Sequence, residues 1–493
     1  MRVVCVSAEC EPWAKTGGLG DVVDALARAV GTGRPGPLAE VEPPVDVFLP
    51  KYRGMKIPDT AAVRRLSVPD PAAPGGSTSV NLVEFEARGY RVRLVDHPPA
   101  FDRDDYYGGP VGDYPDNGWR FGLLCRTALE ALRADDRPVD VLHLHDWQAM
   151  VAAVLRDVAY RDDPGIGRAA VVATIHNLAY QGWIGREAAK GMLFPAELTA
   201  SIGSADGILL LREGISRAEL SNTVSPGYAA EVLRPEFGMG MDGVLRGLGD
   251  RFGGIINGLD MAVWDPATDD ALPARYERMD RAGKAECRRA LLSELAFDPH
   301  DDGPLFGLIG RLDPQKGFDL LADATPAIVA AGGRIVAEGT GDPKMAAGLR
   351  HFAAAHPRQV ALIEKFDRAL ARRIYAGADF FVMPSRFEPC GQGQMIAMRY
   401  GTPPVVHRTG GLADTVVDVD ERPDDGTGFV FGAATPEALA EACRRAIARH
   451  RAGGPAWDAL VDRGMAIDWS WESGPAERYV ASYRRAISLR RER

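Results

Sequence analysis

PSRFEPCG, residues Pro384 to Gly391, is the stretch that decides the fold class, because it joins a strand pattern to a helix pattern. The apolar run Asp379 to Met383 before it is typical of a buried strand, and Met395 to Tyr400 after it is typical of an amphipathic helix. Ligands of open α/β sheets bind at the carboxyl ends of strands, where such turns project side chains and expose helix amides. We therefore predict that Glu388 lies in an active site, although an isolated glutamate in such a turn more often caps the helix or lies in solvent.

Strand and helix patterns alternate along nearly the whole chain. In the first half, strands are predicted at residues 3–8, 45–49, 92–95, 141–144, 171–175 and 222–224, and helices at 21–30, 119–133, 148–160 and 228–233. In the second half, strands are predicted at 305–309, 334–337, 360–363, 379–383 and 405–407, and helices at 318–331, 344–356, 369–376, 395–400 and 412–417. This alternation predicts an α/β fold with two doubly wound parallel sheets that are covered by helices on both faces.

The chain is expected to form two domains, because its 493 residues exceed the usual size of a single core. A hinge is predicted near Asn257 to Asp260, where the first sheet ends in a turn. The predicted domains are residues 1–257 and 258–468, and a helix within residues 469–493 is expected to cross back to the first domain. The glycine- and proline-rich segments 31–44 and 69–76 are predicted to be loops.

Composition excludes several classes of protein. The formal charge of −10 argues against a nucleic-acid surface or an anionic membrane as partner, while it leaves room for a local basic pocket. The apolar start of the chain is too short for a signal peptide, and no apolar run has the length of a membrane span. The six cysteines are dispersed without a CxxC pair, which argues against a zinc site and favours reduced thiols in a cytoplasmic protein.

Two glycine-containing loops follow the first predicted strand of each half. In KTGGLGD, Lys15 to Asp21, the glycines let the backbone approach a phosphate, and Lys15 adds positive potential near a helix start. The loop lacks the GxGxxG spacing of a dinucleotide site, and it could instead simply let helix and strand pack. In GRLDPQKG, Gly310 to Gly317, Arg311 and Lys316 could clamp a diphosphate or remain solvated.

Histidine and aromatic residues cluster in two further segments at predicted strand ends, His143 to Trp147 and Thr174 to Gly182. Imidazole, amide and carboxylate groups beside aromatic rings suit a sugar, whose hydroxyls need hydrogen bonds and whose C–H faces stack on rings. One such histidine is more often a satisfied core residue, but two equivalent segments favour a sugar site. The Asp418-Val-Asp420 pattern resembles a metal-binding DxD, but its acidic surroundings predict a surface loop.

Taken together, these segments resemble the bacterial and plant glycogen and starch synthases, which are retaining glycosyltransferases of the GT-B type. The matching runs occur in the family's order along essentially the whole chain. They are AKTGGLGDVVDAL (14–26), HDWQA (145–149), TIHNLAYQG (174–182), NTVSPGYAAEV (222–232), INGLDMAVWDP (256–266), GRLDPQKG (310–317), PSRFEPCG (384–391) and RYGTPPVVHRTGGLADTV (399–416).

The resemblance implies two Rossmann-like domains, the first on the acceptor side and the second binding the nucleotide sugar, with the active site in the cleft between them. It implies transfer of glucose from ADP-glucose to the non-reducing 4-hydroxyl of an α-1,4-glucan, with retention of configuration and without cofactor or metal. The expected partners are therefore ADP-glucose and the glucan, with no nucleic acid and no membrane. Domain closure is expected to exclude water during transfer. The oligomeric state stays open, and a homo-oligomer is compatible with the sequence.

The resemblance also assigns roles to individual residues. Residues expected to be catalytic are Glu388, His176 and Lys15. Residues expected to bind the donor are Lys15, Gly18, Asn257, Arg311, Lys316, Phe366, Glu388, Cys390, Gly391, Gln392 and Gly393. Residues expected on the acceptor or sugar side are Asp21, Asp146, Trp147 and Asn177, and no metal ligand is expected.

Two departures from the family pattern affect these expectations. Gln392-Gly393 stands where the family usually has Leu-Thr or Leu-Gly, and Phe366 stands where a tyrosine commonly stacks on the base. The preference for ADP over UDP is therefore less firmly implied than phosphate binding. Two other functions stay open: glucosyl transfer to a small acceptor, which would form maltose 1-phosphate, and a non-catalytic glucan-binding homologue.

Overall fold

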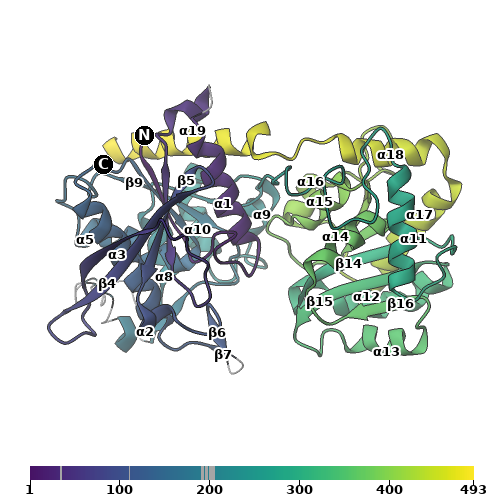
Figure 1. The fold of residues 1–493 in the computed structure, drawn as a ribbon, viewed down its shortest axis with the longest axis horizontal. Helices are drawn as coiled ribbons and strands as arrows, with labels where there is room; N and C mark the ends of the chain where they lie inside the picture. The colour runs from purple at the N-terminus through teal and green to yellow at the C-terminus, as the bar shows by residue number, and fades with distance from the viewer. Residues whose placement is uncertain are drawn as a thin grey trace. The chain divides into compact units, whose positions relative to one another are not determined.

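The computed structural model describes residues 1–33, 36–109, 112–189, 192, 194, 198 and 206–492. The chain divides into two compact units (Figure 1), and each is considered by itself. Unit 1 consists of Met1–Gly258 and Trp471–Arg493, and unit 2 consists of Leu259–Ser470. The chain therefore passes from one unit to the other twice, after Gly258 and after Ser470.

Unit 1 is built on a nine-stranded sheet with the order β13-β12-β9-β8-β1-β2-β5-β4-β3. Its strands are β1 (Val3–Val6), β2 (Val45–Pro50), β3 (Ala62–Pro69), β4 (Ser77–Ala87), β5 (Tyr90–Asp96), β8 (Val141–His145), β9 (Ala170–Ile175), β12 (Leu220–Thr223) and β13 (Phe252–Gly254). The expectation of a purely parallel sheet is wrong at one edge, where β3, β4 and β5 pair antiparallel. The predicted loop 69–76 is the turn of this hairpin.

Helices cover the sheet of unit 1, and two small ribbons extend from it. The helices are α1 (Gly18–Gly31), α2 (Pro98–Phe101), α3 (Asn117–Ala134), α4 (Asp146–Ala149), α5 (Val151–Val158), α6 (Arg186–Ala189), α8 (Leu210–Arg217), α9 (Pro226–Val232), α10 (Asp242–Leu248) and α19 (Pro475–Glu492). The ribbons are β6 (Gly108–Gly109) with β7 (Gly112–Asp113), and β10 (Trp183–Gly185) with β11 (Gly207–Leu209). The helix predicted at 148–160 is two helices, α4 and α5.

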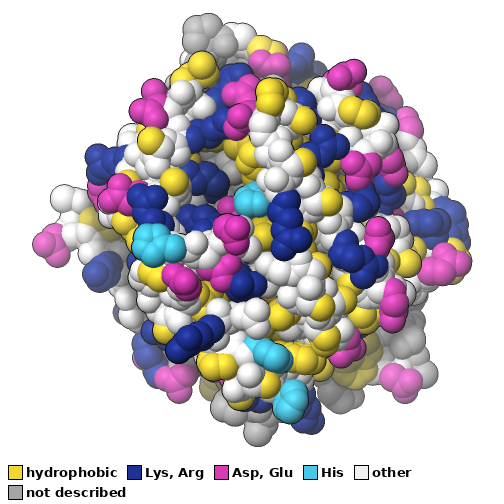
Figure 2. All heavy atoms as spheres, turned by 90° about the vertical axis from the view of Figure 1, so that its right-hand side faces the viewer, with side chains coloured by type: hydrophobic (Ala, Val, Ile, Leu, Met, Phe, Trp, Pro, Cys, Tyr) yellow, Lys and Arg dark blue, Asp and Glu magenta, His cyan; other side chains and the backbone are white. Residues whose placement is uncertain are grey.

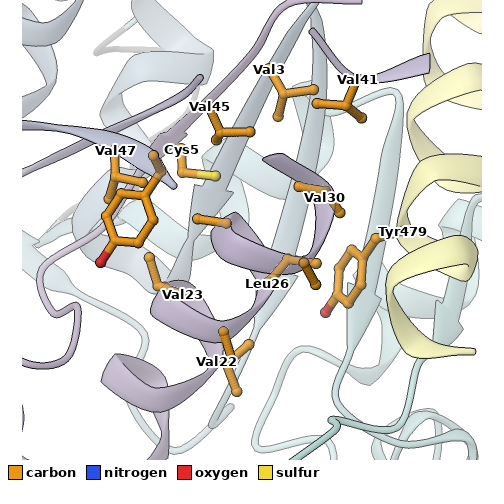
Figure 3. Packing of buried hydrophobic residues seen from close by; sticks show 14 of the residues in the cluster. Val3, Cys5, Val22, Val23, Leu26, Val30, Val41, Val45, Val47 and Tyr479 are labelled. Carbon is orange, nitrogen blue, oxygen red and sulfur yellow. The ribbon is translucent and has the colours of Figure 1, made fainter. Parts of the chain in front are cut away.

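The core of unit 1 forms where α1 packs against the first strands. Val22, Leu26 and Val30 recur at helical spacing, and they are buried beside Val3 of β1 and Tyr479 of α19 (Figure 3). The C-terminal helix α19 is thus a core element of unit 1, although it follows unit 2 in the sequence. α1 is the first helix after the buried strand β1, and the glycine loop lies at its start.

Unit 2 has a six-stranded parallel sheet with the order β16-β15-β14-β17-β18-β19. Its strands are β14 (Leu305–Leu312), β15 (Arg334–Gly341), β16 (Val360–Ile363), β17 (Phe380–Met383), β18 (Pro404–His407) and β19 (Phe429–Phe431). Its helices are α11 (Ala282–Glu294), α12 (Phe318–Ala330), α13 (Ala347–Ala355), α14 (Arg368–Gly377), α15 (Gly393–Arg399), α16 (Gly410–Thr415), α17 (Pro436–Ala452) and α18 (Gly454–Ala466). The order runs outward in both directions from β14 and β17, so the loops after these two central strands leave the sheet side by side.

Figure 2 views the molecule from the right-hand side of Figure 1 and shows basic and acidic side chains interspersed on that face. Among the described helices, none combines the length and the apolar character that are needed to cross a membrane. All six cysteines are buried as free thiols.

The expectation that Asp418 lies in an acidic surface loop is wrong. Asp418 is buried, and its Oδ2 accepts a hydrogen bond of 2.6 Å from the backbone N–H of Val430. The Arg445 guanidinium lies 3.3 Å from the same carboxylate. The first aspartate of the DxD pattern therefore anchors β19 and α17 instead of facing solvent.

Candidate active site

Glu388 lies in the turn after β17 and is buried, with 4% of its surface exposed. Its Oε2 accepts hydrogen bonds from Lys316 Nζ at 2.6 Å and from Ser385 Oγ at 2.9 Å. The backbone carbonyl of Glu388 accepts a bond of 3.0 Å from Gly411 N in α16. The carboxylate is therefore held in one position by side chains from two loops, as expected of a group that must meet a substrate in a fixed geometry.

The loop that supplies Lys316 is fixed by a cap and a close backbone contact. Asp313 Oδ1 accepts a bond of 3.1 Å from the backbone N–H of Lys316, and Gly317 adopts φ 70°. A Cβ on Gly317 would lie 2.3 Å from the carbonyl oxygen of Pro384, so only glycine lets the two loops approach this closely. The structure thus brings Lys316 to Glu388, whereas the guanidinium of Arg311 lies near Asp313 and Gln315 on the outer side of the loop, with nearly half of its surface exposed.

The residues after Glu388 form a compact turn that is held by a side chain not predicted from the sequence. Gln394 is fully buried, and its Nε2 donates to the carbonyl oxygens of Cys390 and Gly391, each at 3.1 Å. Cys390 is buried and Gly391 has φ 71°. Gln392 and Gly393 lie half-buried at the start of α15. The departure from the family pattern therefore lies at the helix start, while Gln394 shapes the turn itself.

Phe366 lies in the loop after β16, with 63% of its surface exposed. The next residue, Asp367, caps α14, and its backbone N–H donates to Glu338 Oε1 at 2.5 Å. Glu338 is a second residue that the sequence did not single out. It is fully buried within β15, its Oε2 has no hydrogen-bond partner among the described residues, and burial raises its pKa to about 7.

In unit 1, the KTGGLGD loop forms a turn around the carboxylate of Glu9, directly after β1. Glu9 accepts hydrogen bonds from Thr16 N at 2.6 Å and from Tyr107 Oη at 2.5 Å. A Cβ on Gly17 or Gly18 would meet no described heavy atom within 4 Å. Close packing of the helix on the strand therefore does not require glycine at these two positions. Their bare backbone is instead suited to the close approach of a ligand.

Lys15 and Asp21 form an ion pair within this loop. Lys15 Nζ lies 2.5 Å from Asp21 Oδ1, and Asp21 is in the first turn of α1. Both side chains keep a quarter to a third of their surface exposed. The structure thus brings together two residues for which the resemblance implies different roles, one on the donor side and one on the acceptor side.

His176 follows β9 and is positioned by a second histidine, His145 at the end of β8. His145 Nδ1 lies 3.0 Å from His176 Nε2. Burial lowers the pKa of His176 to about 3 and that of His145 well below its usual value, so both rings are neutral. The sequence pattern did not single out His145, although it lies within the His143 to Trp147 segment.

The hydrogen bond between the two rings also decides where their protons lie. His145 Nε2 is buried and has no hydrogen-bond partner among the described residues. A buried N–H without an acceptor costs more than an unpaired ring nitrogen. We therefore infer that His145 carries its proton on Nδ1 and donates a hydrogen bond to His176 Nε2. His176 Nε2 is then the acceptor, and His176 carries its own proton on Nδ1. His176 is therefore prepared to donate a hydrogen bond from Nδ1.

Asp146 and Trp147 organise the loops around His176. Asp146 Oδ1 accepts a bond of 2.7 Å from the backbone N–H of His176, and burial raises the pKa of Asp146 to about 7. Trp147 is buried, because the backbone of Gly182 lies against its indole, where a Cβ would come within 2.4 Å of the ring. Asn177 Oδ1 accepts a bond of 3.0 Å from Ala179 N. Trp147 thus fixes the loop and does not present an open ring face.

Asn257 is buried at the end of unit 1, and its Oδ1 has no hydrogen-bond partner in the described part of the chain. A buried amide oxygen without a partner costs free energy unless a ligand or water meets it. Asn257 therefore has the property expected of a substrate-binding residue.

One cluster of possible metal ligands occurs among the described residues, formed by Cys5, His143 and His145 with donor atoms within 4.8 Å of one another. His143 Nδ1 lies 2.9 Å from Tyr483 Oη, and His143 Nε2 lies 2.8 Å from Thr174 Oγ1. Both ring nitrogens of His143 are thus used in hydrogen bonds, one that ties α19 to the sheet and one that joins β8 to β9. His143 therefore has a structural role in the core of unit 1.

Comparisons with known proteins agree with the resemblance drawn from the motifs. The family described as "Starch synthase catalytic domain" matches residues 2–247, and the family described as "Glycosyl transferases group 1" matches residues 303–449. The glycogen synthase of Halorhodospira halophila is 42% identical over 502 residues, which cover 99% of this chain and 100% of that protein. The glycogen synthase of Anaeromyxobacter dehalogenans is 42% identical over 498 residues, which cover 98% and 99%.

The catalytic domain of starch synthase IV from Arabidopsis thaliana, solved with ADP and acarbose bound, is similar in fold with a TM-score of 0.87. The sequence identity is 33%, and the match covers 99% of both chains. The predicted α/β fold with two Rossmann-like domains of the GT-B type is confirmed. Since these similarities extend over the full length of the chain, the protein belongs to the glycogen and starch synthase family of glycosyltransferases.

Proposed function

We propose that the chain transfers glucose from ADP-glucose to the non-reducing 4-hydroxyl of an α-1,4-glucan, with retention of configuration and without a metal. The observation that supports this most directly is the buried Glu388 carboxylate held by Lys316 and Ser385. A carboxylate next to an ammonium group supplies both charges that the reaction needs. The ammonium neutralises the leaving diphosphate, and the carboxylate stabilises positive charge that develops on the sugar.

Three cations of the candidate site serve the diphosphate in this proposal. Arg311 lies near the end of β14, Lys316 lies in the turn that follows it, and Lys15 belongs to the glycine loop of unit 1. The bare backbone at Gly17 and Gly18 adds N–H groups at the start of α1. The Arabidopsis relative was solved with ADP and acarbose, which supports a nucleoside diphosphate as the leaving group.

His176 and Asn257 contact the glucosyl group in this proposal. The proton on Nδ1 of His176 makes it a hydrogen-bond donor, and the unpaired Oδ1 of Asn257 makes it an acceptor. A sugar hydroxyl can satisfy both kinds of partner. The neutral state of His176, which results from its burial, avoids repulsion with charge that develops on the sugar.

Phe366 contacts the base in this proposal. Its exposed ring offers a stacking face but no hydroxyl, so the preference for adenine depends on stacking and shape. Phe366→Ala is expected to raise the KM for ADP-glucose, whereas Phe366→Tyr is expected to keep it near the wild-type value. We also propose a cytoplasmic location, since the free buried thiols suit a reducing compartment.

The test measures the transfer of labelled glucose from ADP-glucose and, in parallel, from UDP-glucose. Each donor is offered with glycogen or with glucose 1-phosphate, in the presence of EDTA. Label that enters glycogen from ADP-glucose supports the proposal. Label in a soluble phosphorylated disaccharide would assign a small acceptor instead. A requirement for added Mg²⁺ would contradict the metal-free mechanism. No transfer with any pair of donor and acceptor would indicate a non-catalytic homologue.

A further inference from the structure

Trp183 is exposed on a rigid part of unit 1, and its indole lies flat on a glycine. It belongs to the ribbon of β10 and β11, in which Trp183 pairs with Leu209 and Gly185 pairs with Gly207. A Cβ on Gly207 would lie 2.8 Å from the indole ring, so one ring face covers the backbone of this diagonal neighbour. Nevertheless 61% of the Trp183 surface is exposed. The other face of the ring is therefore open to solvent.

The face of the ribbon opposite Trp183 is packed against unit 1. Ile184, the next residue, points to the opposite face of the ribbon and is buried. Its Cγ2 packs against Gly118 of α3, where a Cβ would lie 2.8 Å from it. The backbone N–H of Leu210 donates to Gly182 O at 3.1 Å. The orientation of the Trp183 ring is thus set by packing on both sides of the ribbon.

The segment between the proposed sugar site and Trp183 is also fixed. Tyr180 N donates to Asn177 O at 3.2 Å, and Gln181 Nε2 donates to Met239 O at 3.0 Å. Gly182, with φ 65°, lies against the buried Trp147. Tyr180 is itself 52% exposed. Tyr180 and Trp183 are therefore two large exposed aromatic residues, three positions apart, in the segment that follows His176 and Asn177.

We propose that Trp183 is a stacking platform for a glucosyl unit of the glucan acceptor, with Tyr180 beside it in the chain. This inference rests on the proposed function, because it names a further contact of the same acceptor. Covering Gly207 explains one face of the indole, but it does not explain an open second face on a rigid ribbon. An open aromatic face binds the C–H face of a pyranose, and a planar ring loses little conformational freedom in doing so.

The test measures binding of maltoheptaose and of glycogen to the full chain without any donor, by titration calorimetry and affinity electrophoresis. Trp183→Ala is expected to weaken binding about threefold to tenfold, as for the loss of one aromatic contact. Trp183→Phe is expected to retain most of the affinity, because it keeps a ring on Gly207. The matched control is Val63→Ala, which removes an apolar side chain with 65% exposure from the edge strand β3.

The outcomes separate this inference from the proposed function. Wild-type affinity for glucan in a folded Trp183→Ala protein would overturn the platform. If, in addition, this variant sediments as a smaller species than the wild type, the ring would be assigned to contact with a second copy of the chain. If Trp183→Ala does not fold, weaker binding by Trp183→Leu supports the platform and unchanged binding overturns it. If the wild type binds glucan but transfers no glucose, and Trp183→Ala loses that binding, the platform is supported although the proposed function fails.

Discussion

Lys316 Nζ lies 2.6 Å from Glu388 Oε2, and the two side chains come from the loops after the two central strands of unit 2. Parallel strands β14 and β17 are neighbours in the sheet although more than sixty residues separate them in sequence. The carboxyl ends of adjacent parallel strands lie at one edge, which is why GRLDPQKG and PSRFEPCG meet. Their contact is a consequence of topology, and it places an ammonium and a carboxylate side by side in a buried position.

Glu388→Gln tests whether the charge of this carboxylate is needed for transfer. The amide has nearly the same shape and can still accept from Ser385, so the melting temperature is expected to change by only a few degrees. The rate of transfer from ADP-glucose to glycogen is expected to fall about 100-fold or more, as on removal of one preorganised electrostatic group. The control is Glu421→Gln, on a surface carboxylate paired with Arg408. A near-normal rate would remove Glu388 from the site.

Lys15→Ala tests the positive charge of the glycine loop in unit 1. Its ion pair with Asp21 is partly solvated, so its loss is expected to cost at most about 1 kcal/mol of stability. Transfer is expected to fall by orders of magnitude, because the diphosphate loses a cation. Lys51→Ala is a matched control, since Lys51 has the same 31% side-chain exposure and pairs with Asp96 at 3.1 Å. Equal rates in the two variants would contradict the role of Lys15.

His145 is expected to act through His176, as a positioning residue. His145→Ala removes the donor to His176 Nε2, so transfer is expected to fall at least about tenfold, within the range for a misplaced proton donor. His145→Asn is expected to restore part of the rate, because the asparagine amide nitrogen falls near the position of Nδ1. Imidazole ¹⁵N chemical shifts are the second readout. They are expected to show His176 protonated on Nδ1 in the wild type and a mixture of tautomers in His145→Ala; an Nε2 proton in the wild type would refute the assignment.

Asp146 is expected to make the stability of unit 1 fall as the pH rises, which is opposite to the usual effect of a carboxylate paired in the folded state. Its pKa is about 7 in the folded state and near 3.8 in the unfolded chain, so the folded state binds the extra proton between these values. The contribution of Asp146 to stability is thus present at low pH and is lost as the pH rises toward 7. Asp146→Asn is expected to remove this fall, which is at most about 4 kcal/mol at ~1.4 kcal/mol per pKa unit. Urea unfolding of both proteins at pH 4, 5, 6, 7 and 8 measures it, and a constant difference across this range would contradict the raised pKa.

Much of the fold follows from the sequence because the buried parallel strands are short apolar runs bounded by turn residues. β16 has its predicted bounds, and β2, β8 and β17 differ from theirs by one residue. The sequence did not predict β3, because its residues alternate between exposed and half-buried positions and include Arg64 and Arg65. An edge strand needs no continuous apolar run, so its pattern resembles a loop. β13 and β19 were missed because three residues are too few to show a period.

The candidate site was predictable where a motif places a charge at a strand end, as for Lys316 and Glu388. It was not predictable where a buried polar group acts through another residue. Glu338 bonds to the backbone N–H of Asp367 in a distant loop, and sequence does not show which loops are neighbours. Glu9 and Gln394 bond to backbone groups of nearby turns, whose conformation the sequence does not show. Glu9 and Glu338 do share one recognisable property, because each is an acidic residue near the end of an apolar strand pattern.

Gly317→Ala tests whether contact between the two loops is needed to hold Lys316 against Glu388. The new Cβ would lie 2.3 Å from Pro384 O, and φ 70° is unfavourable for alanine, so unit 2 is expected to lose at least about 2 kcal/mol of stability. If the loops separate to relieve the contact, Lys316 leaves the carboxylate, and transfer falls more than the loss of folded protein explains. The control is Gly432→Ala, at a position with no positive φ and no described heavy atom within 4 Å of the new Cβ. Thermal unfolding and initial rates below the transition measure both effects. A Gly317→Ala protein as stable and active as Gly432→Ala would show that the loops reach their arrangement without this contact.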